Sequence, residues 1–238
     1  MQDERDATAA LNNAEWCTAV WRSHGLPVER AHGLWFCPRP TPQYYPNVVT
    51  VEPGFDPAAQ ASFIAELSRS EPDLALSVKD SFAGLDLHAA GLIPLFDAHW
   101  LVRAPDADIG SSGNLRWRRI DDERSLAAWE RVWRGADRKS QRIFRRELLL
   151  DRRAIVLGGM DRQETIRAGG IAYDAAGALG LTNIFGPRPD FIHALAAMLP
   201  ARQMVGYEAG ADLQSAEQTG FRLLGPLRVW VKSLRTFE

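Results

Sequence analysis

Few side chains in this sequence combine the right chemical type with a useful position. The clearest is Glu208, which follows Tyr207 at the end of a segment that we expect to be a strand. A carboxylate at a strand end beside a cleft can accept a proton from an amine, directly or through a water molecule. The alternative is an ordinary solvated surface carboxylate. Glu208 is therefore a candidate general base, with that alternative open.

Histidine and cysteine are too sparse to indicate metal chemistry. The chain has five His and two Cys, with no HxxxH or CxxC spacing, so we expect no metal site. His193 lies among the apolar residues of an expected helix, where a lone histidine is more often structural than catalytic. Cys17 and Cys37 are too few for a disulfide scaffold and favour a reducing, cytoplasmic location.

Strands and helices alternate around Glu208 in the second half of the chain. Alternating apolar residues indicate strands, and apolar residues three and four apart indicate helices. The order predicts an α/β fold with a mixed sheet, antiparallel at first, in which one late β-α-β crossover creates a parallel pair. The expected strands are 115–120, 153–158, 166–173, 178–185, 203–208, 222–224 and 227–231, and the expected helices are 125–133, 140–150, 191–199 and 212–219.

The first half carries a shorter version of the same order. Gly54 precedes Gly186 by 132 residues, and Trp100 precedes Trp230 by 130 residues. Such self-similarity suggests two copies of one unit, of which the first is truncated. The expected strands of this copy are 47–52, 74–78 and 96–103, and the expected helices are 57–68 and 85–90.

A polar stretch at 104–114, rich in Gly, Ser and Pro, separates the two halves. The net charge changes at the same place, from −8 for residues 1–110 to +6 for residues 111–238. We therefore expect one unit in residues 1–110 and a second in residues 111–238.

The end of the chain carries a more specific pattern. A strand reading into Val205-Gly-Tyr-Glu-Ala-Gly210 is followed by a helix that ends in Gly220-Phe221 and by a hydrophobic closing strand that contains Trp230. Together with the element order, this pattern resembles the GNAT superfamily of acetyl-CoA-dependent N-acyltransferases. The resemblance covers residues 115–238 and, as a degenerate copy, residues 45–103. It implies a GNAT-like acyl-CoA N-acyltransferase fold in which two parallel strands splay apart and admit acetyl-CoA.

The resemblance also implies where the cofactor binds. Unpaired backbone groups at the splay bind the pantetheine, and the pyrophosphate lies at the N-terminus of the next helix, where free N–H groups and the helix dipole favour anions. Arg188 would add a charge-assisted contact to a phosphate. The implied cofactor-binding residues are Thr182, Asn183, Ile184, Phe185, Gly186 and Arg188.

Two features depart from the family pattern. The family's phosphate loop reads Gln/Arg-x-x-Gly-x-Gly/Ala, whereas this chain has Gly186-Pro-Arg-Pro-Asp-Phe191. Its prolines donate no N–H, and Asp190, expected to open the helix, brings a negative charge; the alternative is a plain connector. Ala216 stands where many members place the tyrosine that protonates the departing thiolate. Tyr207 and Tyr173 are the nearest substitutes, and an ordinary core position is the alternative for each.

Aromatic residues are concentrated in the segment 16–47. We expect the tryptophans of this segment, including Trp16 and Trp21 on a helix that ends at Gly25, to belong to the core. Tyr44 and Tyr45 are better candidates for lining a pocket between the halves, because a proline-rich loop cannot easily bury them.

Composition limits the function further. The chain has 238 residues, of which 46% are hydrophobic and 24% charged, as in ordinary globular proteins. The net charge of −2 argues against general nucleic-acid binding. The acidic, polar N-terminus is unlike a signal peptide, and no apolar window is long enough for a membrane span. We expect a cytoplasmic N-acetyltransferase that uses acetyl-CoA and an amine of a small molecule or protein. The alternative is a non-catalytic protein of the same fold that binds a small ligand or partner.

Overall fold

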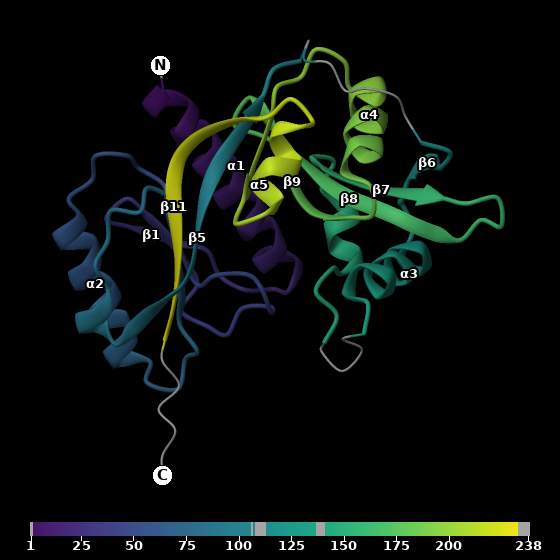
Figure 1. Ribbon diagram of the computed structural model, residues 1–238. Coiled ribbons are helices and arrows are strands. Elements are labelled where there is room, and N and C mark those ends of the chain that lie inside the picture. Colours follow the sequence, from purple (N-terminus) through teal and green to yellow (C-terminus); the bar gives the residue numbers. More distant parts are fainter. Residues whose placement is uncertain (1, 106, 108–112, 137–140, 233–238) are drawn as a thin grey trace.

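The computed structural model describes residues 2–105, 107, 113–136 and 141–232. Within these residues, 11 strands form one mixed sheet in the order β1-β2-β3-β4-β11-β5-β10-β9-β8-β7-β6 (Figure 1). The strands are β1 (Glu29–Ala31), β2 (Leu34–Phe36), β3 (Val48–Thr50), β4 (Ser77–Asp80), β5 (Leu92–Arg103), β6 (Arg116–Arg119), β7 (Ala154–Met160), β8 (Ile166–Ala175), β9 (Ala178–Phe185), β10 (Met204–Glu208) and β11 (Arg222–Lys232). The helices are α1 (Gln2–Ser23), α2 (Pro57–Ser70), α3 (Glu123–Arg134), α4 (Arg188–Met198) and α5 (Asp212–Glu217), with short 3-10 helices η1 (His88–Ala90) and η2 (Arg146–Leu150). The predicted mixed α/β class is confirmed.

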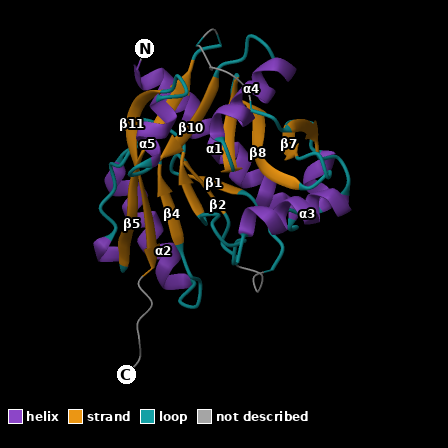
Figure 2. Ribbon diagram, turned by 45° about the vertical axis from the view of Figure 1, so that its right-hand side comes forward, coloured by secondary structure: helices purple, strands orange, loops and turns teal. Residues whose placement is uncertain are grey.

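The two faces of the sheet bury separate apolar cores. On β7, Val156 points into the core beneath α1 and α3, whereas its neighbours Ile155 and Leu157 point into the core beneath α4. This alternation is what a strand produces when helices cover both faces. Figure 2 shows β11 and β5 in one part of the sheet and β8 and β7 in the other, with α1 between the two parts in this view.

The N-terminal helix α1 is clamped to the sheet by one buried amide. Nδ2 of Asn12 lies 2.9–3.0 Å from the carbonyl oxygens of Tyr173, Ala175 and Ala178. Gly180 makes this approach possible, because a Cβ at that position would lie 1.7 Å from Oδ1 of Asn12. The helix is therefore held against β8 and β9 next to the site described below. Among the described residues, no helix is both long and apolar enough to cross a membrane.

Each half contributes its closing strand to the other half's part of the sheet. β5, which ends the first half, pairs with β10, and β11, which ends the chain, pairs with β4. Each half also contains a parallel crossover, β3-α2-β4 in the first and β9-α4-β10 in the second. Because one sheet spans both halves and the expected boundary at 104–114 lies partly outside the described residues, the division into two units stays a prediction.

The helix expected at 140–150 is not a regular helix where the structure describes it. The described part of this range contains only the 3-10 helix η2. The backbone before η2 is held by the buried carboxylate of Glu130. That carboxylate accepts hydrogen bonds from the backbone N–H of Ile143 at 2.7 Å and of Phe144 at 3.4 Å. These bonds replace the ones that an α-helix would make.

Smaller differences concern the ends of elements. The two expected strands 222–224 and 227–231 are one strand, β11, with a register irregularity between Leu223 and Pro226. The helix expected at 125–133 begins two residues earlier, because Asp122 caps α3 by accepting a hydrogen bond from the backbone N–H of Ser125. The hairpin of β1 and β2 has no predicted counterpart, since its first strand lacks apolar alternation.

Candidate functional site

The parallel strands β9 and β10 are paired only where they begin. Met204 lies opposite Leu179, and Val205 lies opposite Gly180. Beyond these positions β9 continues along β8, while β10 stays paired with β5. Facing edges of the two strands are thus left without a partner among the described strands, and their backbone groups can bind a ligand. The splay that the resemblance implies is present.

A bulge in β9 lies on the open side of this divergence. The pairs Gly169–Phe185 and Ile171–Thr182 leave one extra residue on β9. Asn183 takes up the extra length with a φ of 53°, a left-handed conformation that asparagine tolerates better than most residues. Its Oδ1 accepts hydrogen bonds from the hydroxyls of Thr182 at 2.9 Å and Tyr45 at 3.2 Å. The bulge interrupts the regular pairing of β9 with β8 beside the gap, and the pairing resumes at Phe185.

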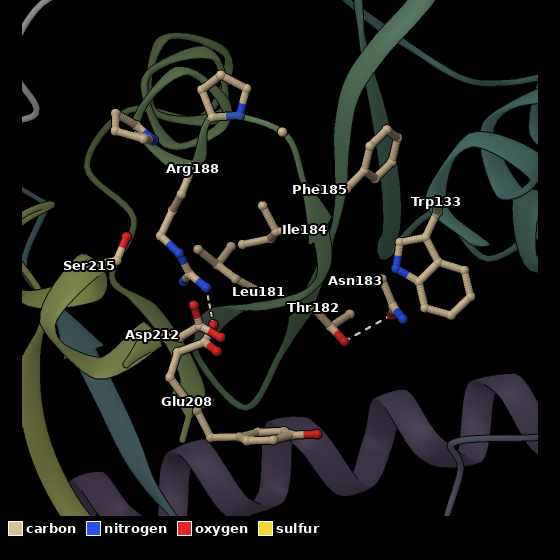
Figure 3. Close-up of a pocket in the computed structure, with 14 residues that line it drawn as sticks. Trp133, Leu181, Thr182, Asn183, Ile184, Phe185, Arg188, Glu208, Asp212 and Ser215 are labelled. Atoms are coloured by element: carbon tan, nitrogen blue, oxygen red, sulfur yellow. Dashed lines mark hydrogen bonds and ion pairs between the residues drawn. The ribbon is translucent and has the colours of Figure 1, made fainter. Parts of the chain in front are cut away.

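The divergence opens a cavity of about 650 Å³ (Figure 3). All six predicted cofactor-binding residues and both predicted catalytic residues line it, although the role of each stays a prediction. The structure adds Trp133, Asp212 and Ser215, which the sequence did not single out as site residues. The lining residues are Trp133, Leu181, Thr182, Asn183, Ile184, Phe185, Gly186, Pro187, Arg188, Pro189, Tyr207, Glu208, Asp212 and Ser215.

Gly186 makes the turn from β9 into α4. Its φ is 75°, and a Cβ there would lie 2.6 Å from Cβ of Ala168 on β8. Only glycine meets both requirements. Pro187 and Pro189, at the start of α4, have no N–H, so the backbone donors that remain at this helix end are those of Gly186, Arg188 and Asp190.

Arg188 reaches across the cavity from the first residue of α4 and forms an ion pair with Glu208 at the end of β10 (Figure 3). The two side chains are 16% and 22% exposed, so the pair is largely shielded from water. Burial raises the pKa of Glu208, while Arg188 acts in the opposite direction. The predicted phosphate ligand and the predicted general base are therefore partners of each other.

Asp190 does not have the position that the sequence predicted. The helix α4 begins at Arg188, its N-cap is Pro187, and the Asp190 carboxylate accepts a hydrogen bond from the backbone N–H of Gly113 at 3.0 Å. Asp190 is absent from the residues that line the cavity. The expectation that Asp190 opens the helix was wrong, since α4 begins two residues earlier. Its side chain holds the start of the segment that leads into β6, and opposition of its charge to a bound phosphate stays a prediction of the sequence.

The hydroxyl groups that could replace the missing acid at Ala216 belong to other residues. Ala216 is fully buried, whereas its neighbour Ser215 lines the cavity. Tyr207 also lines the cavity, with its ring against Trp100 at 5.6 Å between centroids. Tyr173 is buried and donates to Asp151 Oδ2 at 2.8 Å, so its alternative as a core residue is confirmed. Among these tyrosines, Tyr207 remains the candidate proton donor.

Aromatic residues form the wall of the cavity opposite the ion pair. Trp133 and Phe185 line the cavity, and the exposed ring of Tyr44 lies edge-on to Trp133, with centroids 5.9 Å apart. Tyr45 is buried instead, and reaches the site only through its hydrogen bond to Asn183. Neither tyrosine lines this cavity, and the expectation that the proline-rich loop cannot easily bury its tyrosines was wrong for Tyr45.

The charged residues among the described lining are Arg188, Glu208 and Asp212. Formal charges therefore sum to −1 when both carboxyl groups are ionised. Among the described residues, no three His, Cys, Asp or Glu side chains are grouped so as to hold a metal ion. The chemistry that the lining offers is proton transfer and anion or amine binding.

No family model and no curated protein matches this sequence. Solved structures do match it. A GCN5-related N-acetyltransferase from Kribbella flavida superposes with a TM-score of 0.69 at 15% sequence identity, covering 96% of this chain and 97% of that one. The chain has the GNAT fold.

Two further structures support this assignment of the fold. A GCN5-related N-acetyltransferase from Sphaerobacter thermophilus matches with a TM-score of 0.57 at 10% identity, over 95% of this chain and 93% of that one. A structure described as a putative acetyltransferase of the GNAT family from Novosphingobium aromaticivorans matches with a TM-score of 0.53 at 14% identity, over 90% of this chain and 97% of that one. At these identities the likeness concerns the fold alone.

Proposed function

We propose that this chain is an N-acyltransferase that transfers the acyl group of acetyl-CoA to an amine. The observation that carries the proposal is the divergence of β9 and β10 beside the bulge at Asn183, which opens a cavity lined by both strands. Parallel strands rarely separate in this way within a sheet that is otherwise continuous, since open backbone edges need partners. The GNAT fold of the matched acetyltransferases supports the same interpretation.

The lining residues fit the pantetheine and acyl parts of acetyl-CoA better than its diphosphate. Acetyl-CoA supplies an acyl group that is already activated as a thioester. The open backbone edge of β9, from Thr182 to Phe185, offers N–H groups to the pantetheine amides and to the thioester carbonyl. Gly186 and Arg188, which line the cavity, would contact the phosphates, but the two prolines reduce the number of backbone donors at this helix end. We therefore expect acetyl-CoA to bind weakly for a protein of this fold.

Glu208 would accept the proton of the attacking amine, and Tyr207 would donate a proton to the departing thiolate. Both residues line the cavity at the end of β10. Burial raises the pKa of Glu208. The carboxylate is therefore a stronger base than a solvated glutamate and better suited to take a proton from the amine. The enclosed cavity would align amine and thioester, which lowers the entropic part of the barrier. The acceptor is an amine of unidentified structure, and a cytoplasmic location remains part of the proposal.

A non-catalytic binding protein is the second candidate. The observation that favours it is the ion pair of Arg188 with Glu208, because it occupies both the phosphate ligand and the base. In that case the cavity would bind a small ligand or partner without transferring an acyl group.

Titration calorimetry with acetyl-CoA, followed by an acetyl-transfer assay with a panel of amines, tests the proposal. We expect acetyl-CoA to bind the wild-type protein and to lose affinity in Arg188→Ala. Arg202→Ala is the matched control, since Arg202 pairs with Asp174 and does not line the cavity. Binding with no transfer to any amine would favour the non-catalytic candidate. Absence of acetyl-CoA binding would contradict the proposed function.

A further inference from the structure

The ion pair between Arg188 and Glu208 joins two groups that the proposed function assigns to different tasks. Arg188 is the one cation in the described lining of the cavity, and it extends from the helix end where phosphates would bind. Glu208 lies on the opposite strand, β10, with its carboxylate against the guanidinium (Figure 3). Each group therefore already has a partner when the cavity contains no donor.

A phosphorylated donor needs the same guanidinium. If Arg188 held the carboxylate and a diphosphate together, the two anions would lie side by side in a cavity that water only partly screens. Asp212, on the same side of the cavity, adds a third negative charge and is close enough to affect the titration of Glu208. The arrangement thus disfavours simultaneous binding of both anions by one arginine.

We infer that Glu208 competes with the phosphate groups of the donor for Arg188, so that binding of a phosphorylated donor releases Glu208 to act on the amine. The inference rests on the proposed function and adds donor discrimination to it. A thioester of pantetheine alone has no phosphate, so it leaves Glu208 paired with Arg188 and unable to accept a proton. Glu208 is in this sense a specificity-determining residue as well as a base.

Binding affinities of CoA and its fragments test the competition without depending on catalysis. Glu208→Gln keeps the size of the side chain and removes its charge, so CoA, dephospho-CoA and phosphopantetheine should each bind about tenfold more tightly to this variant. Pantetheine, which has no phosphate, should bind wild type and variant with equal affinity. Asp212→Asn is the matched control, because it removes one negative charge from the same cavity but leaves the ion pair intact. We expect it to change CoA affinity by about twofold.

A double-mutant cycle separates competition from a general charge effect. With Arg188→Ala already in place, Glu208→Gln should raise CoA affinity by no more than Asp212→Asn does. An equal gain with and without Arg188, or a gain that also appears with pantetheine, would overturn the inference. Binding of CoA that Glu208→Gln leaves unchanged overturns this inference but not the proposed function. Absence of CoA binding to wild type and to all variants overturns both the inference and the proposed function. Thermal unfolding of each variant checks that it is folded.

Discussion

Gly186 provides a quantitative test of how the fold shapes the cavity. Its φ is 75°, and a Cβ at this position would lie 2.6 Å from Cβ and 3.0 Å from Cα of Ala168. Gly54 lies in the turn between β3 and α2, the helix of the other parallel crossover, with a φ of 81°, but no atom lies within 4 Å of a Cβ built there. Gly54→Ala and Gly186→Ala therefore both carry the cost of a left-handed backbone, but only Gly186→Ala also creates a steric clash.

The two costs can be given magnitudes. A left-handed conformation costs a residue other than glycine about 1–2 kcal/mol. An additional methyl group in a packed site costs about 1–3 kcal/mol more. We therefore expect Gly54→Ala to lower the free energy of unfolding by about 1–2 kcal/mol and Gly186→Ala to lower it by about 2–5 kcal/mol. Because the clash moves the turn that precedes Arg188, Gly186→Ala should also weaken binding of acetyl-CoA, and Gly54→Ala should not.

Urea unfolding of both variants, followed by fluorescence of the tryptophans, measures the difference directly. Calorimetry with acetyl-CoA on the same preparations measures the effect on binding. Equal losses of stability in the two variants would refute the steric argument. A Gly186→Ala protein that is destabilised but binds acetyl-CoA as wild type does would show that the turn does not position the donor site.

Three further predictions concern single side chains in or beside the site. Arg188→Ala should weaken acetyl-CoA binding by about tenfold to a hundredfold, the equivalent of one charge-assisted hydrogen bond, as measured by calorimetry against Arg202→Ala. Asp190→Asn should leave the affinity for acetyl-CoA within about twofold of wild type, because the asparagine oxygen can accept the same hydrogen bond from Gly113. A large gain in affinity would show that the Asp190 charge lies near the phosphates. The rate of acyl transfer should rise with pH as Glu208 loses its proton, with an inflection above the ordinary pKa of a glutamate because burial raises it, and a rate profile without that inflection would exclude Glu208 as the base.

Much of the fold was predictable because strong local patterns coincide with burial. The strand 178–185, the crossover helix and the strand 203–208 all appear within two or three residues of their expected bounds. The sequence patterns failed where a side chain from another element determines the backbone conformation. Glu130, on the preceding helix α3, holds the segment expected to form the helix 140–150 by accepting hydrogen bonds from Ile143 and Phe144. No local periodicity contains that information.

The site was predictable in position but not in contacts. The resemblance placed the cleft along Thr182–Gly186, and these residues line the cavity. The pairing of Arg188 with Glu208 depends on how far two strands diverge, which the sequence does not specify. Trp133 was missed as a lining residue because its helical spacing indicates a core position. Ser215 was missed because the family pattern points to Ala216, one residue later, whose side chain is buried.

The proposed function requires an acyl-CoA donor to bind between β9 and β10. Amide hydrogen exchange with and without acetyl-CoA tests it most directly, because it reports which backbone groups the donor covers. We expect slower exchange at residues 182–186 and at the start of α4, with little change in α2 and β3 of the first half. Binding that protects another part of the chain and leaves exchange at residues 182–186 unchanged would contradict this location of the donor.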